Sequence, residues 1–107
     1  MNEEDYLILL KQQLVKERIQ NAIVLSHLDE DFYQDLSKWR ESASKEQNEE
    51  AHSLLLQLTR IRIGKILCYS DTQEVNGIHD RLAKEEKSLY QKIHQACIEF
   101  NSEVLNR

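Results

Sequence analysis

Residues 54–69, with the sequence LLLQLTRIRIGKILCY, form the apolar stretch around which we expect the rest of the chain to fold. Wound as a helix at about 100° per residue, the stretch carries apolar side chains on nearly every side. The only sector without a large apolar residue holds Gln57, Arg60 and Gly64. The alternating IRI in its middle would also suit a β-strand, but the unbroken run is too long for one strand. Because a helix that is apolar nearly all round has to be buried on several sides, we predict a central helix over about residues 49–69.

The composition is typical of an all-α protein. The chain has 107 residues, no proline and two glycines, whereas a β-sandwich or barrel needs turn residues at short, regular intervals. Leu, Ile, Glu, Gln and Lys are abundant, as in helical proteins. We therefore expect residues 1–107 to form a single all-α domain with four to five helices, organised around the central hydrophobic helix.

Further amphipathic helices are predicted on both sides of the central one. The first begins after a cap at Asn2, the second is capped by Asp29, and the last runs from about residue 82 to residue 105. Residues 40–49 are either a mobile connector or a solvated helix extension. The predicted inward side chains are Tyr6, Leu7, Leu10, Leu14 and Ile19 in the first helix, Phe32, Leu36, Trp39 and Ala43 in the second, and Leu82, Leu89, Ile93, Ala96, Phe100 and Val104 in the last.

The chain has more apolar helix surface than one small domain needs. On the first helix Ile8, Leu9 and Val15 lie outside the centre of the inward stripe. They form either a broad core face or a docking face for a partner helix. On the central helix the corresponding surplus residues are Leu55, Ile63 and Leu67. We expect these six residues to form an interface, most simply that of a symmetric homodimer.

Arg62 and Lys65 interrupt the apolar arc of the central helix. Charges on such a helix must reach an edge or pair with carboxylates. We expect both to form structural ion pairs or carbonyl contacts with neighbouring helices. The chain has a formal net charge of −5, so its overall field does not favour nucleic acid or anionic membrane, and direct DNA contact is not expected.

No catalytic, cofactor or metal site is predicted. Glu49 and His52 form one Glu-x-x-His motif, but a di-iron bundle needs two such motifs and further glutamates. The two glycines cannot build a phosphate-binding loop, and the zinc-protease motif H-E-x-x-H is absent from the sequence. Cys68 and Cys97 lack CxxC spacing and are predicted to be buried thiols in a reducing compartment. The sequence shows neither a secretory leader nor a membrane-spanning run, which predicts a cytoplasmic or nuclear protein.

Three segments resemble, in order, the α-helical domain of GINS subunits, the scaffold proteins of archaeal and eukaryotic replicative helicases. Residues 28–33, LDEDFY, resemble the L-x-x-D-F-Y opening of a family helix. Residues 58–67, LTRIRIGKIL, resemble the L-x-x-x-R-x-x-K-I-L core helix and place Arg62 and Lys65 on its two basic positions. Residues 85–90, EEKSLY, resemble the E-E-x-x-L-Y start of the last helix.

The resemblance implies a non-enzymatic DNA-replication scaffold. GINS helical domains pack into a dimer or tetramer with copies of themselves or with other GINS subunits, and they bridge the MCM helicase and a RecJ-like or Cdc-type partner. A helical domain that begins at Met1 is similar to the subunit type in which a small β domain follows, and that domain is expected to be absent here because the chain ends at Arg107. The chain is then either a truncated subunit or a natural single-domain version. Gly64 stands where the family more often has a larger residue, and close approach of another helix would explain it.

The resemblance also gives a cellular location, either the archaeal cytoplasm around the nucleoid or a eukaryotic nucleus. Two alternatives from other functional classes remain open on the sequence. One is a generic helical adaptor for protein interactions. The other is a metal-binding helical enzyme that uses Glu49 and His52.

Overall fold

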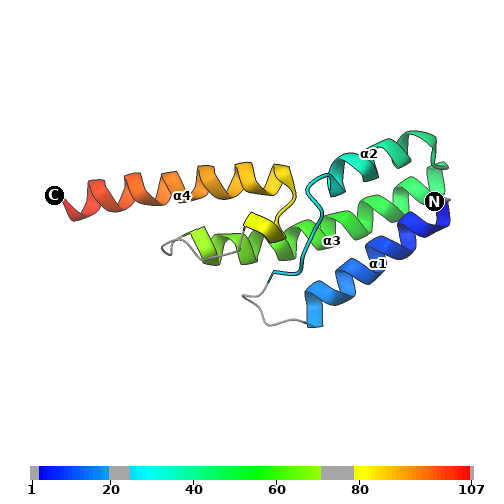
Figure 1. The fold of residues 1–107 in the computed structure, drawn as a ribbon, viewed down its shortest axis with the longest axis horizontal. Helices are drawn as coiled ribbons and strands as arrows, with labels where there is room; N and C mark the ends of the chain where they lie inside the picture. The colour runs from blue at the N-terminus through cyan, green and yellow to red at the C-terminus, as the bar shows by residue number, and fades with distance from the viewer. Residues whose placement is uncertain (1–2, 20–24, 71–78, 107) are drawn as a thin grey trace.

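The computed structural model describes residues 3–19, 25–70 and 79–106. They form four α-helices, namely α1 (Glu3–Ile19), α2 (Phe32–Ser42), α3 (Lys45–Ser70) and α4 (Lys84–Leu105), with a short 3₁₀ turn, η1 (His79–Arg81), before α4. The prediction of an all-α fold is confirmed, since these residues include no strand. The helix α3 runs through the middle, with α1 and α2 beside its N-terminal half and α4 beside its C-terminal half (Figure 1).

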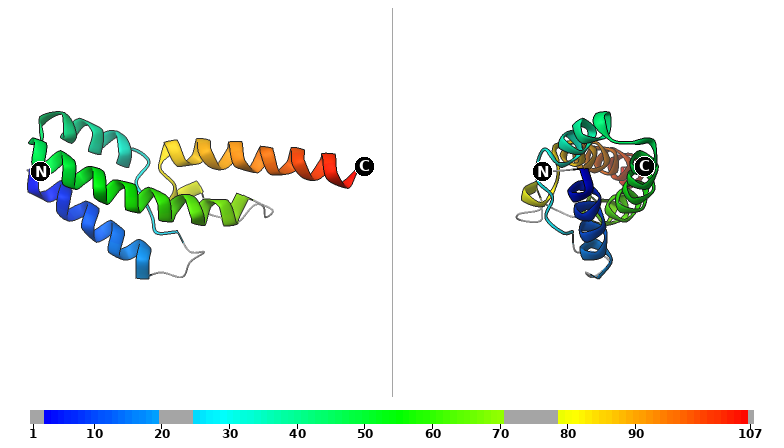
Figure 2. Two further views of the ribbon diagram at one scale, coloured as in Figure 1. Left: turned by 180° about the vertical axis from the view of Figure 1, so that it is seen from behind. Right: turned by 90° about the vertical axis from the view of Figure 1, so that its right-hand side faces the viewer.

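The molecule is elongated. Its principal extents are 55 × 25 × 20 Å and its radius of gyration is 16.0 Å, against about 13 Å for a compact domain of this length. The two views of Figure 2 show the cause, because α4 continues well beyond the last turn of α3. The C-terminal half of α4 therefore has no described helix beside it.

The N-terminal half of α3 is covered by an apolar core. The fully buried members of this cluster are Leu10, Leu14, Leu36, Trp39, Ala51 and Leu58. Tyr6 stacks on Trp39 with 5.4 Å between the ring centroids, a favourable arrangement for two aromatic rings. The inward stripes predicted for the first two helices are thus correct for Leu10, Leu14, Leu36 and Trp39.

A smaller apolar cluster lies at the other end of α3. It consists of Leu25, Ile66, Leu82 and Tyr90, with Ile93 packed against it. These residues come from α3, from α4 and from the two segments that precede α2 and α4. This end of the bundle thus has fewer apolar residues, and charged residues fill the space between the two clusters.

Two helix starts differ from the predictions. The helix α2 begins at Phe32 rather than after Asp29, because backbone bonds from Leu28 N to Arg81 O (3.1 Å) and from Lys84 N to Glu30 O (3.0 Å) pair its preceding segment with the one before α4. The helix α3 begins at Lys45, about four residues early. The Ser44 hydroxyl accepts a bond from Gln47 N (3.1 Å), and the Gln47 side chain accepts one from Ser44 N (2.8 Å). This is a capping box, which the S-x-x-Q spacing encodes.

Several apolar residues predicted to be buried are exposed. Ile19 in the last turn of α1 is 78% exposed, and Phe100 is 63% exposed. Ala96 and Val104 are exposed as well. The residues on α4 lie where that helix has passed the end of α3. The central helix is also less enclosed than its sequence suggests, since Leu56, Ile63 and Leu67 form an exposed face. The predicted cap at Asn2 lies outside the described residues.

Candidate functional site

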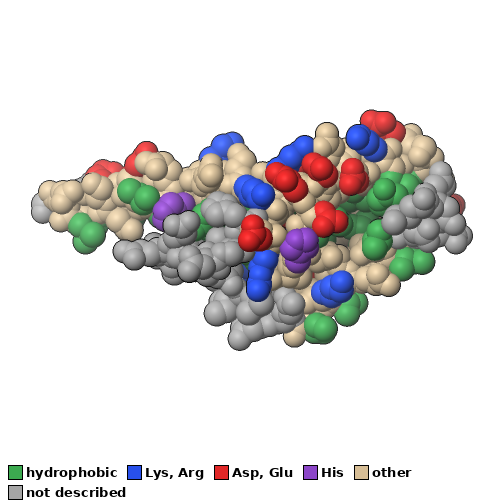
Figure 3. Space-filling view, viewed as in Figure 1, with side chains coloured by type: hydrophobic (Ala, Val, Ile, Leu, Met, Phe, Trp, Pro, Cys, Tyr) green, Lys and Arg blue, Asp and Glu red, His purple; other side chains and the backbone are tan. Residues whose placement is uncertain are grey.

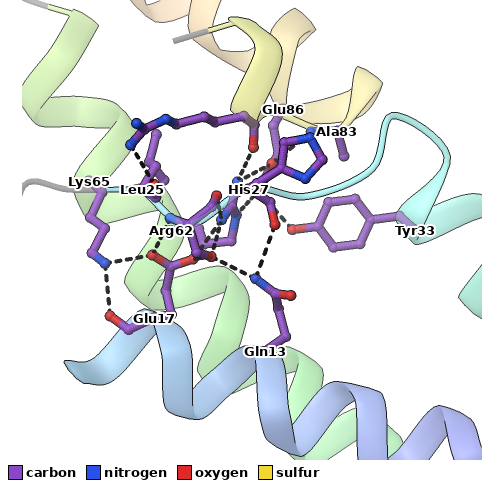
Figure 4. A network of polar contacts seen from close by, with 11 residues as sticks. Gln13, Glu17, Leu25, His27, Tyr33, Arg62, Lys65, Ala83 and Glu86 are labelled. Atoms are coloured by element: carbon purple, nitrogen blue, oxygen red, sulfur yellow. Dashed lines mark hydrogen bonds and ion pairs between the residues drawn. The ribbon is translucent and has the colours of Figure 1, made fainter. Parts of the chain in front are cut away.

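A network of charged side chains is buried where α1, α3 and α4 meet, with Arg62 of α3 at its centre (Figure 4). The Arg62 Nε and Nη2 atoms donate to the two oxygens of Glu86 at 2.6 and 2.8 Å. Nη1 donates to Glu17 Oε1 at 2.5 Å and to the Ser26 carbonyl at 2.9 Å, and Nη2 also reaches the Arg81 carbonyl at 3.0 Å. All five N–H groups of the guanidinium therefore have acceptors.

Glu17 is the acceptor on α1. Its carboxylate receives bonds from Lys65 Nζ (2.5 Å), from Ser26 Oγ (2.6 Å) and from Arg62. Burial raises the pKa of Glu17, but the hydrogen bonds from Lys65 and Ser26 and the charge of Arg62 outweigh burial and hold that pKa below its ordinary value. Glu17 is therefore ionised inside the protein.

Lys65 also completes the C-terminal end of α1. Its Nζ donates to the Glu17 backbone carbonyl at 2.8 Å. Glu17 lies two residues before the end of α1, where carbonyls have no partner within the helix. A buried cation at this position also suits the negative end of the helix dipole.

Glu86 is the acceptor on α4. One oxygen accepts the backbone N–H of Ala83 at 3.0 Å, which is half of a capping box at the start of α4. The other oxygen accepts the hydroxyl of Tyr33, from α2, at 2.8 Å. Burial and the charge of Glu86 raise the pKa of Tyr33, so the phenol keeps its proton throughout the ordinary pH range. Burial lowers the pKa of Arg62, but Glu86 and Glu17 raise it above its ordinary value.

The network joins four helices. Its two cations, Arg62 and Lys65, balance the two anions, Glu17 and Glu86, and the four side chains are nearly fully buried. Through the Ser26 and Arg81 carbonyls, Arg62 also fixes the segments that precede α2 and α4. Its role in the structure is to position helices. Because Arg62 and Lys65 are buried in ion pairs, neither side chain is available to bind a phosphate group. Arg60, by contrast, is exposed.

The six residues expected at an interface have different surroundings. Ile8, Val15, Ile63 and Leu67 are exposed, and Leu9 is 40% exposed at the α2 side of α1. Leu55 differs from the expectation, because it is half-buried and packs against the apolar core. Its neighbour Leu56 is exposed instead, and it shares one helix face with Ile63 and Leu67 at intervals of seven and four residues. We call these three residues the α3 face.

Gly64 borders the α3 face. A Cβ atom built there has no atom of a neighbouring helix or side chain within 4 Å, apart from those of the adjacent residues Ile63 and Lys65. Glycine inside a helix costs about 1 kcal/mol relative to alanine. The described part of the chain thus contains no contact that requires a glycine at this position.

Other candidate sites from the sequence gain no support. Glu49 and His52 are both exposed on α3, and the described residues contain no group of three His, Cys, Asp or Glu side chains that could hold a metal. Cys97 is a half-buried free thiol rather than a fully buried one, and the side chain of Cys68 lies outside the described residues. None of the described helices is long and apolar enough to cross a bilayer.

Sequence reasoning did not identify Glu17 and Glu86 as the partners of Arg62 and Lys65. A signal for Glu17 was present, because it follows Leu10 and Leu14 by seven and three residues and so lies on the inward face of α1. An acid on that face needs a buried cation. For Glu86, the signal was its position in the first turn of a helix whose cap residue, Ala83, has no polar side chain.

Comparison with known proteins gives one match. Residues 5–105 match the family model described as the GINS complex protein helical bundle domain. Neither the curated proteins nor the solved structures contain a significant match to the chain.

Proposed function

Because the chain belongs to the GINS family, whose members are non-catalytic subunits of a DNA-replication complex, we propose that it is a scaffold subunit that assembles through exposed helix faces. It pairs with copies of itself or with other GINS subunits, as a dimer or tetramer, and the assembly bridges the MCM helicase and a RecJ-like or Cdc-type protein. It acts at replication forks, either around an archaeal nucleoid or in a nucleus. The observation that carries the proposal is the family match over residues 5–105.

The α3 face is a surface that suits a partner helix. Leu56, Ile63 and Leu67 are 41%, 42% and 50% exposed along one side of the longest helix. Beside Ile63 lies an apolar pocket of about 260 Å³, lined also by Tyr33, Thr59 and Leu89. Apolar surface of this kind on a helix is typical of helix-to-helix docking.

The glycine at position 64 is a second argument for an interface at the α3 face. A glycine at a helix surface lets the backbone of another helix approach closely. Nothing in the described chain fills the space above Gly64. Close approach of a helix from a partner would therefore explain why this position holds a glycine. On α1, Ile8, Val15 and Ile19 repeat the spacing of the α3 face, and they offer a second exposed stripe for assembly.

The substitution Gly64→Leu tests the proposal without damaging the fold. A Cβ atom at this position meets open space, and leucine improves helix propensity by up to about 1 kcal/mol over glycine, so the melting temperature should not fall. It should weaken association about tenfold or more, because overpacking an interface costs roughly 1–3 kcal/mol. Sedimentation velocity at micromolar concentration measures the association, with Ser37→Leu, at an exposed position of α2, as the matched control.

The wild-type chain should sediment as a dimer or larger, alone or mixed with other GINS subunits of its organism, and the assembly should bind purified MCM. A wild-type chain that stays monomeric both alone and in those mixtures contradicts the proposal. Equal association of the Gly64→Leu and wild-type chains places the interface elsewhere and refutes the role given to the α3 face.

A further inference from the structure

A pocket of about 160 Å³ lies between α1 and α2, away from the charge network. Its walls are the side chains of Tyr6, Leu9, Leu10, Phe32 and Leu36. A protein cavity of about 150 Å³ holds a benzene molecule, so this pocket can receive one aromatic ring or a large aliphatic side chain.

Two carboxylates, Asp29 and Asp35, complete the lining of this pocket. They belong to a group of acids around the start of α2, where Figure 3 shows red acidic side chains beside the green apolar side chains between α1 and α2. Two members of the group are matched by lysines of α4, since Asp31 lies 3.4 Å from Lys84 and Glu30 lies 3.7 Å from Lys87.

The two acids at the pocket have no such cation. Among the described residues, the one basic group within 4.0 Å of the Asp29 carboxylate is the His27 ring, and that pair is ionic only when the histidine is protonated. Asp35 forms no ion pair with any residue that the structure describes. The pocket therefore combines an apolar interior with negative charge at its edge.

We propose that this pocket binds a partner protein segment in which a large apolar side chain is flanked by Lys or Arg. The apolar side chain enters between Leu9 and Phe32, and the flanking cations lie against Asp29 and Asp35. The net charge of −5 attracts such a segment at long range. The same charges repel an anionic membrane or an acidic peptide. The site lies on α1 and α2, so it adds to the assembly through the α3 face and does not depend on it.

The protein contains its own reporter for this site. Trp39 is the only tryptophan in the chain, and it stacks on Tyr6, which lines the pocket. A ring that enters the pocket should change the contacts of Tyr6 and so shift the fluorescence of Trp39. Amide chemical shifts of Leu9 and Phe32 provide a second readout at the walls of the pocket.

The probe is the blocked peptide acetyl-Gly-Lys-Phe-Lys-Gly-amide, titrated into the full chain at low salt. We expect millimolar binding that weakens as salt is raised, since exposed charges are screened beyond a Debye length. The Glu-Phe-Glu peptide, with the charges reversed, and the Lys-Ala-Lys peptide, without the ring, should each bind about tenfold more weakly or not at all.

Asp29→Asn combined with Asp35→Asn should weaken the Lys-Phe-Lys probe about three- to tenfold, as expected for the loss of two exposed ion pairs. The control pair, Glu99→Gln with Glu103→Gln on α4, removes the same charge elsewhere and should leave binding unchanged. Gly64→Leu should also bind as the wild type does, which separates this site from the α3 face. Absence of binding to the wild type, equal binding of the Glu-Phe-Glu peptide, or equal loss in both double variants overturns the proposal.

Discussion

The two ends of α3 are buried by different chemistry. Around its N-terminal half the contacts come from Leu10, Leu14, Leu36 and Trp39, which are apolar. Around its C-terminal half, Arg62 and Lys65 meet two carboxylates, with only a small apolar cluster beside them. The same helix is therefore held by non-directional apolar contacts at one end and by directional ion pairs and hydrogen bonds at the other.

The difference predicts unequal tolerance to substitution. The free energy gained by apolar packing is roughly proportional to the buried area, and neighbouring side chains can rearrange. A smaller side chain therefore leaves a cavity but no unsatisfied hydrogen-bonding group. A buried ion pair needs all its partners, because removing one partner leaves an uncompensated charge. The charged end also joins segments from all four helices, including Tyr33 of α2. It is therefore the more sensitive end, although it has fewer apolar contacts.

The largest expected effect is that of Arg62→Met. The change keeps the length of the apolar stem but leaves Glu86 without its cation and Glu17 with Lys65 alone. Breaking a buried pair in this way costs about 3–5 kcal/mol, a large part of the ~5–15 kcal/mol expected for a domain. Urea denaturation followed by circular dichroism measures the loss.

A second variant separates charge from packing. Adding Glu86→Gln to Arg62→Met should recover part of the lost stability, because it removes the orphaned charge. The amide oxygen of the glutamine can still accept the Ala83 N–H, and its NH2 group can donate to the Tyr33 hydroxyl. Lys84→Ala breaks an exposed ion pair with Asp31 and an exposed hydrogen bond to Gln34, and it should cost less than about 1 kcal/mol. If Arg62→Met costs no more than Lys84→Ala, the charged network does not hold this end together.

Leu58→Ala tests the apolar end and should have the next largest effect. Leu58 is fully buried one turn before Arg62, and deleting a buried leucine side chain costs about 2–5 kcal/mol. The lower part of that range is expected if the neighbouring side chains close the cavity. A denaturation midpoint that equals that of the wild type at pH 7 means that the apolar cluster does not carry stability here.

The smallest expected effect is a difference in how the stability of the two ends of α3 depends on pH in the acid range. The folded-state pKa of Glu17 lies below its unfolded value. Its contribution to stability is therefore complete above the unfolded pKa, near 4.5, and is lost as the pH falls from there towards the folded pKa. Urea midpoints at several pH values between neutrality and pH 3 should show that Glu17→Gln has a shallower acid loss than the wild type. Leu58→Ala should lower the urea midpoint at every pH but keep the wild-type dependence of the midpoint on pH. If the midpoints of Glu17→Gln and of the wild type depend equally on pH, Glu17 does not have the role given to it here.

Three properties could be predicted from the sequence alone: the helical class, the central position of α3 and the need of Arg62 and Lys65 for partners. These properties follow from local periodicity, which depends on side chains three or four residues apart. The inward residues of α1 and α2 were predictable for the same reason. The start of α3 at Lys45 was also encoded locally, in the spacing of Ser44 and Gln47.

Which side chains meet one another depends on contacts between segments that are far apart in the sequence. Arg62 lies 45 residues from Glu17 and 24 from Glu86, and no local pattern states which helices cross at its side chain. The start of α2 at Phe32 likewise depends on backbone bonds to the distant segment before α4. The exposure of Ile19 and Phe100 also depends on the tertiary structure. An apolar stripe is buried only where another helix lies against it, and this is determined by the lengths and crossing points of α1, α3 and α4.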